Sequence, residues 1–168
     1  MEIKAEAIKM KKSAPVLAAS TMEQRNLALQ LIAGALEENK AAIFEANKQD
    51  MSYAESNGVA QATQKRLKYD EKKLQDSING VLELKELSDP IGKVLMNRQL
   101  DEGLILKKIT VPIGVIGVIF EARPDAMVQV ASLCIKSGNC AILKGGKETA
   151  NTNRVLFEII KNAVIKAG

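Results

Sequence analysis

The chain of 168 residues contains no histidine, no tryptophan and only two cysteines. The absence of histidine excludes histidine metal ligands, a Ser-His-Asp triad and a histidine general base. Cys134 and Cys140 lie in an apolar region, so we expect small core residues and no disulfide framework. Aromatic residues make up only 3% of the sequence, which argues against nucleic-acid binding by base stacking.

Positive and negative charges are both spread along the chain. The 24 Lys and Arg residues and 20 Asp and Glu residues give a net charge of +4, without the basic stripe that a nucleic-acid backbone requires. The longest apolar run, 113–120, is far shorter than the roughly 20 residues that span a bilayer. The first residues mix charges where a secretory signal needs an apolar stretch. We therefore expect a cytoplasmic protein without a nucleic-acid, membrane or metal partner.

Residues before Pro90 have the pattern of amphipathic helices. Residues 20–23 (Ser-Thr-Met-Glu) predict a capping box at a helix start, and Leu29, Ile32 and Leu36 then recur at helical spacing. The helical pattern continues until Asn57 and Gly58. A further helix is expected after Asp70, and it ends before Pro90 because proline disfavours helical geometry in the residue before it.

A β-hairpin is expected next. Two β-compatible arms, 93–100 and 104–111, flank a polar turn that ends in Gly103. A two-stranded ribbon is marginally stable alone. We therefore expect another surface to cover its apolar face.

From Pro112 the pattern becomes β-α-β-α. The apolar run 115–120 predicts a strand buried on both faces of a parallel sheet, and Pro124 suits the first turn of the helix that follows. A second buried strand is expected at 140–143, and a last helix from about Thr149 to Gly168. The predicted fold class is α/β: N-terminal helices (1–90), a hairpin (91–111) and an incomplete Rossmann-like parallel sheet (112–168).

The turn after the second strand is the first candidate site. It consists of Lys144, Gly145, Gly146 and Lys147, at the strand end where ligands of open α/β sheets gather. Glycines let a backbone approach a ligand closely, and the start of the following helix favours anions. The turn therefore suits a nucleotide phosphate or ribose. An ordinary glycine turn with solvated lysines is the alternative, because neither a G-x-G-x-x-G nor a Walker A pattern is present.

The turn after the first strand is the second candidate. Arg123 follows a buried strand and precedes a helix, which suits the binding of a carboxylate or phosphate. Glu121 could instead hold Arg123 in a structural ion pair, and the spacing leaves both interpretations open.

Three motifs together resemble one enzyme family. They are VPIGVIGVIFEARP (111–124), LCIKSGN (133–139) and ILKGGKET (142–149), and in this order they are similar to the glutamate-5-semialdehyde dehydrogenases, or gamma-glutamyl phosphate reductases. This family is part of the aldehyde dehydrogenase superfamily. General aldehyde dehydrogenases have a Pro-Trp-Asn turn where this chain has Glu-Ala-Arg-Pro, so the turn favours the reductase branch.

The resemblance implies a reaction in proline biosynthesis. A cysteine thiolate attacks gamma-glutamyl phosphate, and NADPH reduces the resulting thioester to glutamate 5-semialdehyde. Lys144 matches a lysine that reaches the adenosine ribose. Lys147 stands where NAD-preferring relatives have a glutamate, which implies NADP. Arg123 and Glu121 would lie on the substrate side.

The chain departs from this family in length. Family members are more than twice as long, and their nucleophilic cysteine lies in a later domain, so neither Cys134 nor Cys140 matches it. The resemblance thus covers an N-terminal portion, and the catalytic residue is not identified in this chain. We expect a form that is inactive alone and that associates with copies of itself or with a missing C-terminal part. A portion of a general aldehyde dehydrogenase and a non-catalytic, self-associating remnant of the fold remain alternatives.

Overall fold

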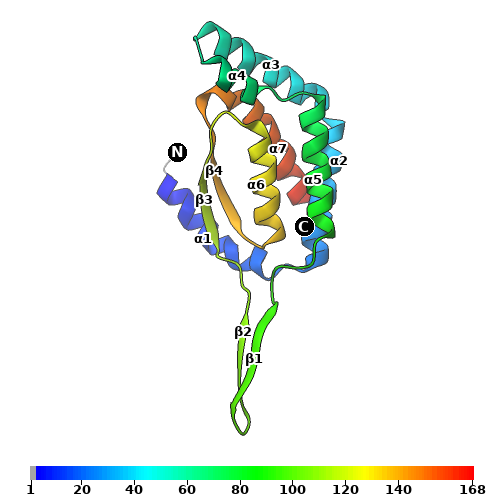
Figure 1. The fold of residues 1–168 in the computed structure, drawn as a ribbon, viewed down its shortest axis with the longest axis vertical. Helices are drawn as coiled ribbons and strands as arrows, with labels where there is room; N and C mark the ends of the chain where they lie inside the picture. The colour runs from blue at the N-terminus through cyan, green and yellow to red at the C-terminus, as the bar shows by residue number, and fades with distance from the viewer. Residues whose placement is uncertain (1–2) are drawn as a thin grey trace.

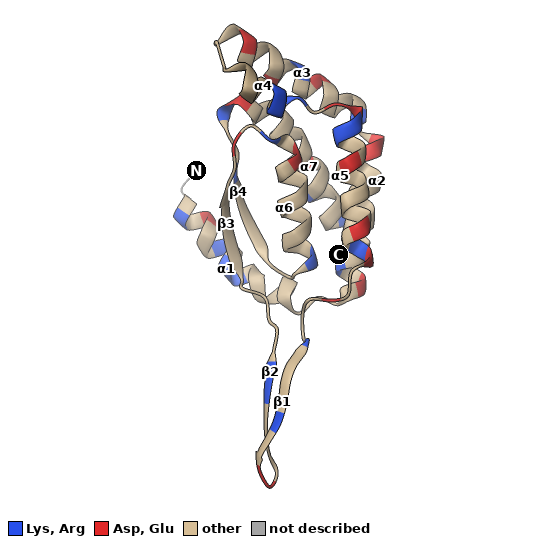
Figure 2. Cartoon of the chain, viewed as in Figure 1, with Lys and Arg blue, Asp and Glu red and all other residues tan. Residues whose placement is uncertain are grey.

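The computed structural model describes residues 3–168 and begins with five helices. They are α1 (Ile3–Ala18), α2 (Met22–Glu38), α3 (Lys40–Ser56), α4 (Gln61–Leu67) and α5 (Glu71–Glu86). Charged residues lie mainly on the outer faces of α2, α3 and α5 (Figure 2). The sequence pattern predicted helices in this half, but it missed α1 and the separate α4.

Two helix starts test the sequence predictions. The helix α5 begins after Asp70 as expected, and the Asp70 side chain caps it by accepting a hydrogen bond from the amide of Lys73. The capping box of α2 was predicted one residue too early. Thr21 is the N-cap residue and Gln24 its partner, with both reciprocal hydrogen bonds present. The hydroxyl of Ser20 instead donates to the carbonyl of Leu17, at the end of the preceding helix.

The hairpin projects away from the helices as a long arm (Figure 1). It consists of β1 (Val94–Asp101) and β2 (Leu104–Ile109), paired antiparallel as expected. Every residue of both strands is exposed. The large apolar side chains of the hairpin strands therefore contact solvent in this chain. They are Val94, Leu95, Met96, Leu100, Leu104, Ile105, Leu106 and Ile109.

A two-stranded parallel sheet follows. The β-α-β-α order is as predicted and consists of β3 (Val115–Ile119), α6 (Pro124–Lys136), β4 (Cys140–Lys144) and, after a short 3-10 turn at Lys147–Thr149, α7 (Ala150–Ala167). The core lies between helices, because α6 and α7 pack against α2 and α5. Residues of the predicted segments 1–90 and 112–168 thus share one hydrophobic cluster. The division of the chain into domains at these bounds stays a prediction.

The expectation that 115–120 is buried on both faces was wrong for this chain. Side chains alternate along a strand, so Val115, Gly117 and Ile119 share one face. The helix α1 lies on that side of the sheet (Figure 1), where its residues and Val115 line a groove. It does not cover the end of the strand, where Ile119 is 77% exposed. Phe120, on the opposite face, packs against the main core cluster.

A buried carboxylate joins α3 to α7. Asp50 is 2% exposed and accepts hydrogen bonds from the backbone amide and side-chain amide of Asn151, at 3.1 and 2.9 Å. Its other oxygen accepts from the amide and hydroxyl of Thr152, at 2.8 and 2.6 Å. A negative charge is favourable here, because the start of a helix carries unpaired amides and a partial positive charge. Asp50 is therefore a long-range cap of α7.

Replacement of this carboxylate tests the role of the cap. We expect Asp50→Ala to lower the free energy of unfolding by about 3 kcal/mol, because it leaves several buried donors without an acceptor. Urea unfolding followed by circular dichroism measures the change. Glu45→Ala, which removes an exposed carboxylate from the same helix, is the matched control. Equal stability of the two variants would contradict the assigned role.

Candidate functional site

Two turns lie side by side at one edge of the parallel sheet. The strands β3 and β4 pair in parallel with Ile119 opposite Lys144, and the amide of Phe120 donates to the carbonyl of Lys144 at 3.1 Å. The turn that follows β3 and the turn that follows β4 therefore leave the sheet at the same end. This is the strand end at which ligands bind in open α/β sheets.

The turn after β3 has a strained backbone. Ala122 has a φ of 47°, in the left-handed region that non-glycine residues rarely adopt. Ala122 is 1% exposed and packs in a small cluster with Ala54 of α3 and Leu67 of α4. Its amide donates to Oε1 of Glu148 at 3.0 Å. Packing and this hydrogen bond together hold the turn in its conformation.

The two glycines of the turn after β4 leave room for side chains of the chain itself. A Cβ atom on Gly145 would overlap the side-chain amide of Asn153. A Cβ atom on Gly146 would overlap the carboxylate of Glu148. The close approach that glycine allows is therefore already used by these two side chains. The diglycine pair alone does not indicate a bound ligand.

The start of α7 does not offer the free anion site that the sequence suggested. The amides of Asn151 and Thr152 already donate to the carboxylate of Asp50. The partial positive charge of this helix end thus faces an internal anion. Any anion that binds beside the turn depends mainly on side-chain cations.

Three basic side chains near the two turns are available for such an anion. Arg123, Lys144 and Lys147 are all exposed. Within residues 3–168 none of them forms a salt bridge or a side-chain hydrogen bond. In that part of the chain Arg123 makes no ion pair with Glu121. The interpretation in which Glu121 holds Arg123 in a structural ion pair is therefore not supported. Unpaired cations at a strand edge suit a phosphate or carboxylate ligand.

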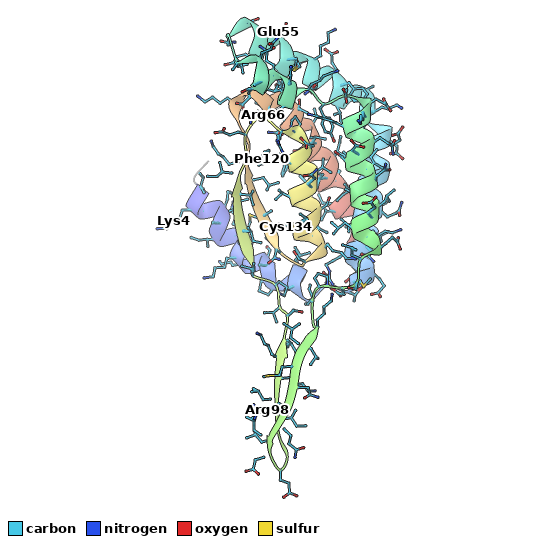
Figure 3. All side chains as sticks on the ribbon, in the orientation of Figure 1. Lys4, Glu55, Arg66, Arg98, Phe120 and Cys134 are labelled. Carbon is cyan, nitrogen blue, oxygen red and sulfur yellow. The ribbon has the colours of Figure 1, made fainter. Side chains whose placement is uncertain are left out.

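Neither cysteine lies at this edge. Cys140 begins β4, at the end opposite Lys144. Cys134 follows Arg123 by 11 residues on α6, about 16 Å along the helix axis. It therefore lies closer to the hairpin than Phe120 does (Figure 3). Burial raises the pKa of both thiols, and both are free, so neither is an activated nucleophile.

The part of the chain that the structure describes lacks two other kinds of functional feature. No cluster of three or more His, Cys, Asp or Glu residues among 3–168 is arranged to hold a metal ion. No helix in the same range is both long enough and apolar enough to cross a membrane.

Comparison with known proteins relates this chain to a family. The gamma-glutamyl phosphate reductase of Pelotomaculum thermopropionicum is 48% identical over 168 residues, which are all of this chain and 39% of the relative. That of Ruminiclostridium cellulolyticum is 51% identical over 152 residues, or 90% of this chain and 35% of the relative. The chain is homologous to an N-terminal portion of gamma-glutamyl phosphate reductases. It spans little more than a third of their length. No family model matches the chain.

Solved structures agree with this homology. The gamma-glutamyl phosphate reductase of Saccharomyces cerevisiae superposes with a TM-score of 0.95 at 40% identity, over 99% of this chain and 42% of that one. The reductase of Thermotoga maritima gives 0.94 at 32% identity, over 99% and 40%. An NAD-dependent benzaldehyde dehydrogenase of Corynebacterium glutamicum gives 0.71 at 18% identity, over 92% and 31%. The last comparison shows the shared aldehyde dehydrogenase fold alone.

Thiol labelling tests the inert character of the two cysteines. We expect Cys134 and Cys140 of the folded chain to react with iodoacetamide at pH 8 at least about tenfold more slowly than in urea, because burial disfavours the thiolate. Mass spectrometry of labelled peptides measures each thiol separately. A folded-state rate above the rate in urea for either cysteine would show an activated thiolate and contradict this assignment.

Proposed function

We propose that this chain is part of an NADPH-dependent gamma-glutamyl phosphate reductase, in which it begins the cofactor domain. The enzyme would convert gamma-glutamyl phosphate to glutamate 5-semialdehyde and phosphate in proline biosynthesis. The observation that carries the proposal is the placement of three unpaired cations at the carboxyl edge of β3 and β4, in a chain homologous to these reductases. A cytoplasmic location, which the free thiols favour, is part of the same proposal.

The turn after β4 would hold the adenosine end of the cofactor. Lys144 and Lys147 are the exposed donors of this turn, and ammonium groups suit phosphate and hydroxyl oxygens. Lys147 would favour a 2′-phosphate, whereas a glutamate there would repel it. The donor set thus fits NADP. When bound, the reduced cofactor supplies the hydride.

The turn after β3 would lie on the substrate side. Arg123 would pair with a carboxylate or phosphate oxygen of the substrate, and Glu121 would lie beside it. The nucleophile is the part that this chain does not supply. A thiolate from residues outside the chain would displace phosphate to form the thioester, because burial raises the pKa of both thiols present.

A second function, self-association, is favoured by the hairpin. Both strands are exposed along their whole length and carry many large apolar side chains. Exposed large apolar side chains in such number mark interaction sites. We therefore include a homo-oligomer formed through the hairpin in the proposal. A non-catalytic chain that associates in this way is the alternative to the reductase.

Charge reversal at Lys147 tests the cofactor assignment. We expect 2′,5′-ADP to bind the chain and to shift the amide signals of residues 144–147 in nuclear magnetic resonance spectra. Lys147→Glu should weaken this binding at least about tenfold, because it sets a carboxylate against the 2′-phosphate. Binding of 5′-AMP should change much less.

Lys166→Glu is the matched control for this experiment. It makes the same charge change at an exposed lysine in the last turn of α7, far along the helix from the turn. Equal weakening by both variants would indicate only a general effect of net charge. If both variants weaken binding equally and Lys147→Glu still prefers 2′,5′-ADP over 5′-AMP as strongly as the unaltered chain does, the assignment of Lys147 is refuted.

Catalytic assay tests whether a nucleophile is present. We expect the 168-residue chain to oxidise no NADPH in the presence of gamma-glutamyl phosphate, because both of its thiols lie away from the candidate site, Cys134 buried and Cys140 partly buried. Absorbance of the reduced nicotinamide follows the reaction. Turnover near the usual enzyme rate of about 10 per second would show that the chain is complete as a catalyst.

A further inference from the structure

Glu148 connects the two turns of the candidate site. It directly follows the turn of Lys144–Lys147, and its Oε1 accepts the hydrogen bond of the Ala122 amide at 3.0 Å. The two residues are 26 apart in sequence. Within residues 3–168 the carboxylate forms no salt bridge, and the backbone amide of Ala122 is its one hydrogen-bond donor there.

Ala122 depends on this acceptor. The residue is buried, and a buried amide without an acceptor is costly. Its left-handed backbone is also unfavourable for alanine, so the conformation persists only while its surroundings hold it. Loss of the Glu148 acceptor would therefore release the turn that carries Glu121 and Arg123.

Gly146 leaves room for the same carboxylate. The carboxylate of Glu148 occupies the space where a side chain on Gly146 would begin. The Glu148 carboxylate therefore lies between the backbone of Gly146, after the end of β4, and the amide of Ala122, after the end of β3.

We propose that Glu148 is a positioning residue that couples the turn of Lys144–Lys147 to the turn of Glu121–Arg123. The names of the two sides, cofactor and substrate, rest on the proposed function. The coupling itself rests on the hydrogen bond, the left-handed Ala122 and the packing against Gly146. A nucleotide that moves the first turn would thereby change how Arg123 is presented.

Amide exchange in the nucleotide-free chain tests the coupling. We expect Glu148→Ala to raise the hydrogen-exchange rate of the Ala122 amide at least tenfold, without change at the core residue Leu156. Glu148→Gln should restore protection, because its amide oxygen can accept the same hydrogen bond. Glu158→Ala, which removes an exposed glutamate on α7, is the control. Unchanged exchange at Ala122 in Glu148→Ala would overturn the proposal.

A second variant keeps the test decisive if Glu148→Ala does not fold. Gly146→Ala places a methyl group where the Glu148 carboxylate lies, so we expect faster exchange at Ala122 here too. Gly34→Ala is its control, because a Cβ atom on Gly34 would meet nothing within 4 Å. Equal exchange at Ala122 in these two alanine variants would contradict the coupling.

Nucleotide titration separates this proposal from the proposed function. We expect 2′,5′-ADP to shift the amide signals of Ala122 and Arg123 in the unaltered chain and in Glu148→Gln. In Glu148→Ala the signals of 144–147 should still shift, while those of Ala122 and Arg123 should not. Shifts that persist at Ala122 in this variant would overturn the coupling. Absence of shifts at 144–147 in the unaltered chain would overturn the nucleotide assignment, and the exchange experiment would still decide the role of Glu148.

Discussion

The parallel pairing of β3 with β4 is the interaction on which the candidate site depends. It places Ile119 opposite Lys144, so the segments that follow β3 and β4 leave the sheet at the same end. A parallel pair requires a crossover, and α6 provides it while packing against the helices of the first half. Without this register Arg123 and Lys147 would not lie at the same edge, and their charges could not act on one ligand.

The sheet and the hairpin have surfaces that this chain does not cover. The sheet has two strands within residues 3–168, so each strand has one edge without a strand partner there. Ile113 and Ile119, beside or within β3, are 83% and 77% exposed. Sheet edges of this kind are normally paired or covered. These surfaces agree with the finding that the chain spans little more than a third of the length of its homologues.

Local sequence patterns predicted the elements that local physics determines. The apolar runs, the glycine-containing turns and Pro124 located both strands of the sheet, the hairpin and the start of α6. The pattern failed where the deciding contact is distant. Asp50 lies 101 residues from Asn151, so no local motif reveals that it occupies the start of α7. The exposure of β3 was also missed, because an apolar run is the same whether or not a partner covers it.

In the candidate site, too, a local sequence pattern does not reveal the contacts that single residues make. In the sequence, a lysine on each side of two glycines predicts a ligand, with the glycines allowing its close approach. In the structure Gly145 makes room for Asn153, and Gly146 makes room for Glu148. Both glycines therefore make room for side chains of the chain itself, and the unpaired cations are the feature that points to an anionic ligand. Glu148, whose carboxylate occupies the space beside Gly146, accepts the hydrogen bond of the Ala122 amide and thereby connects the two turns.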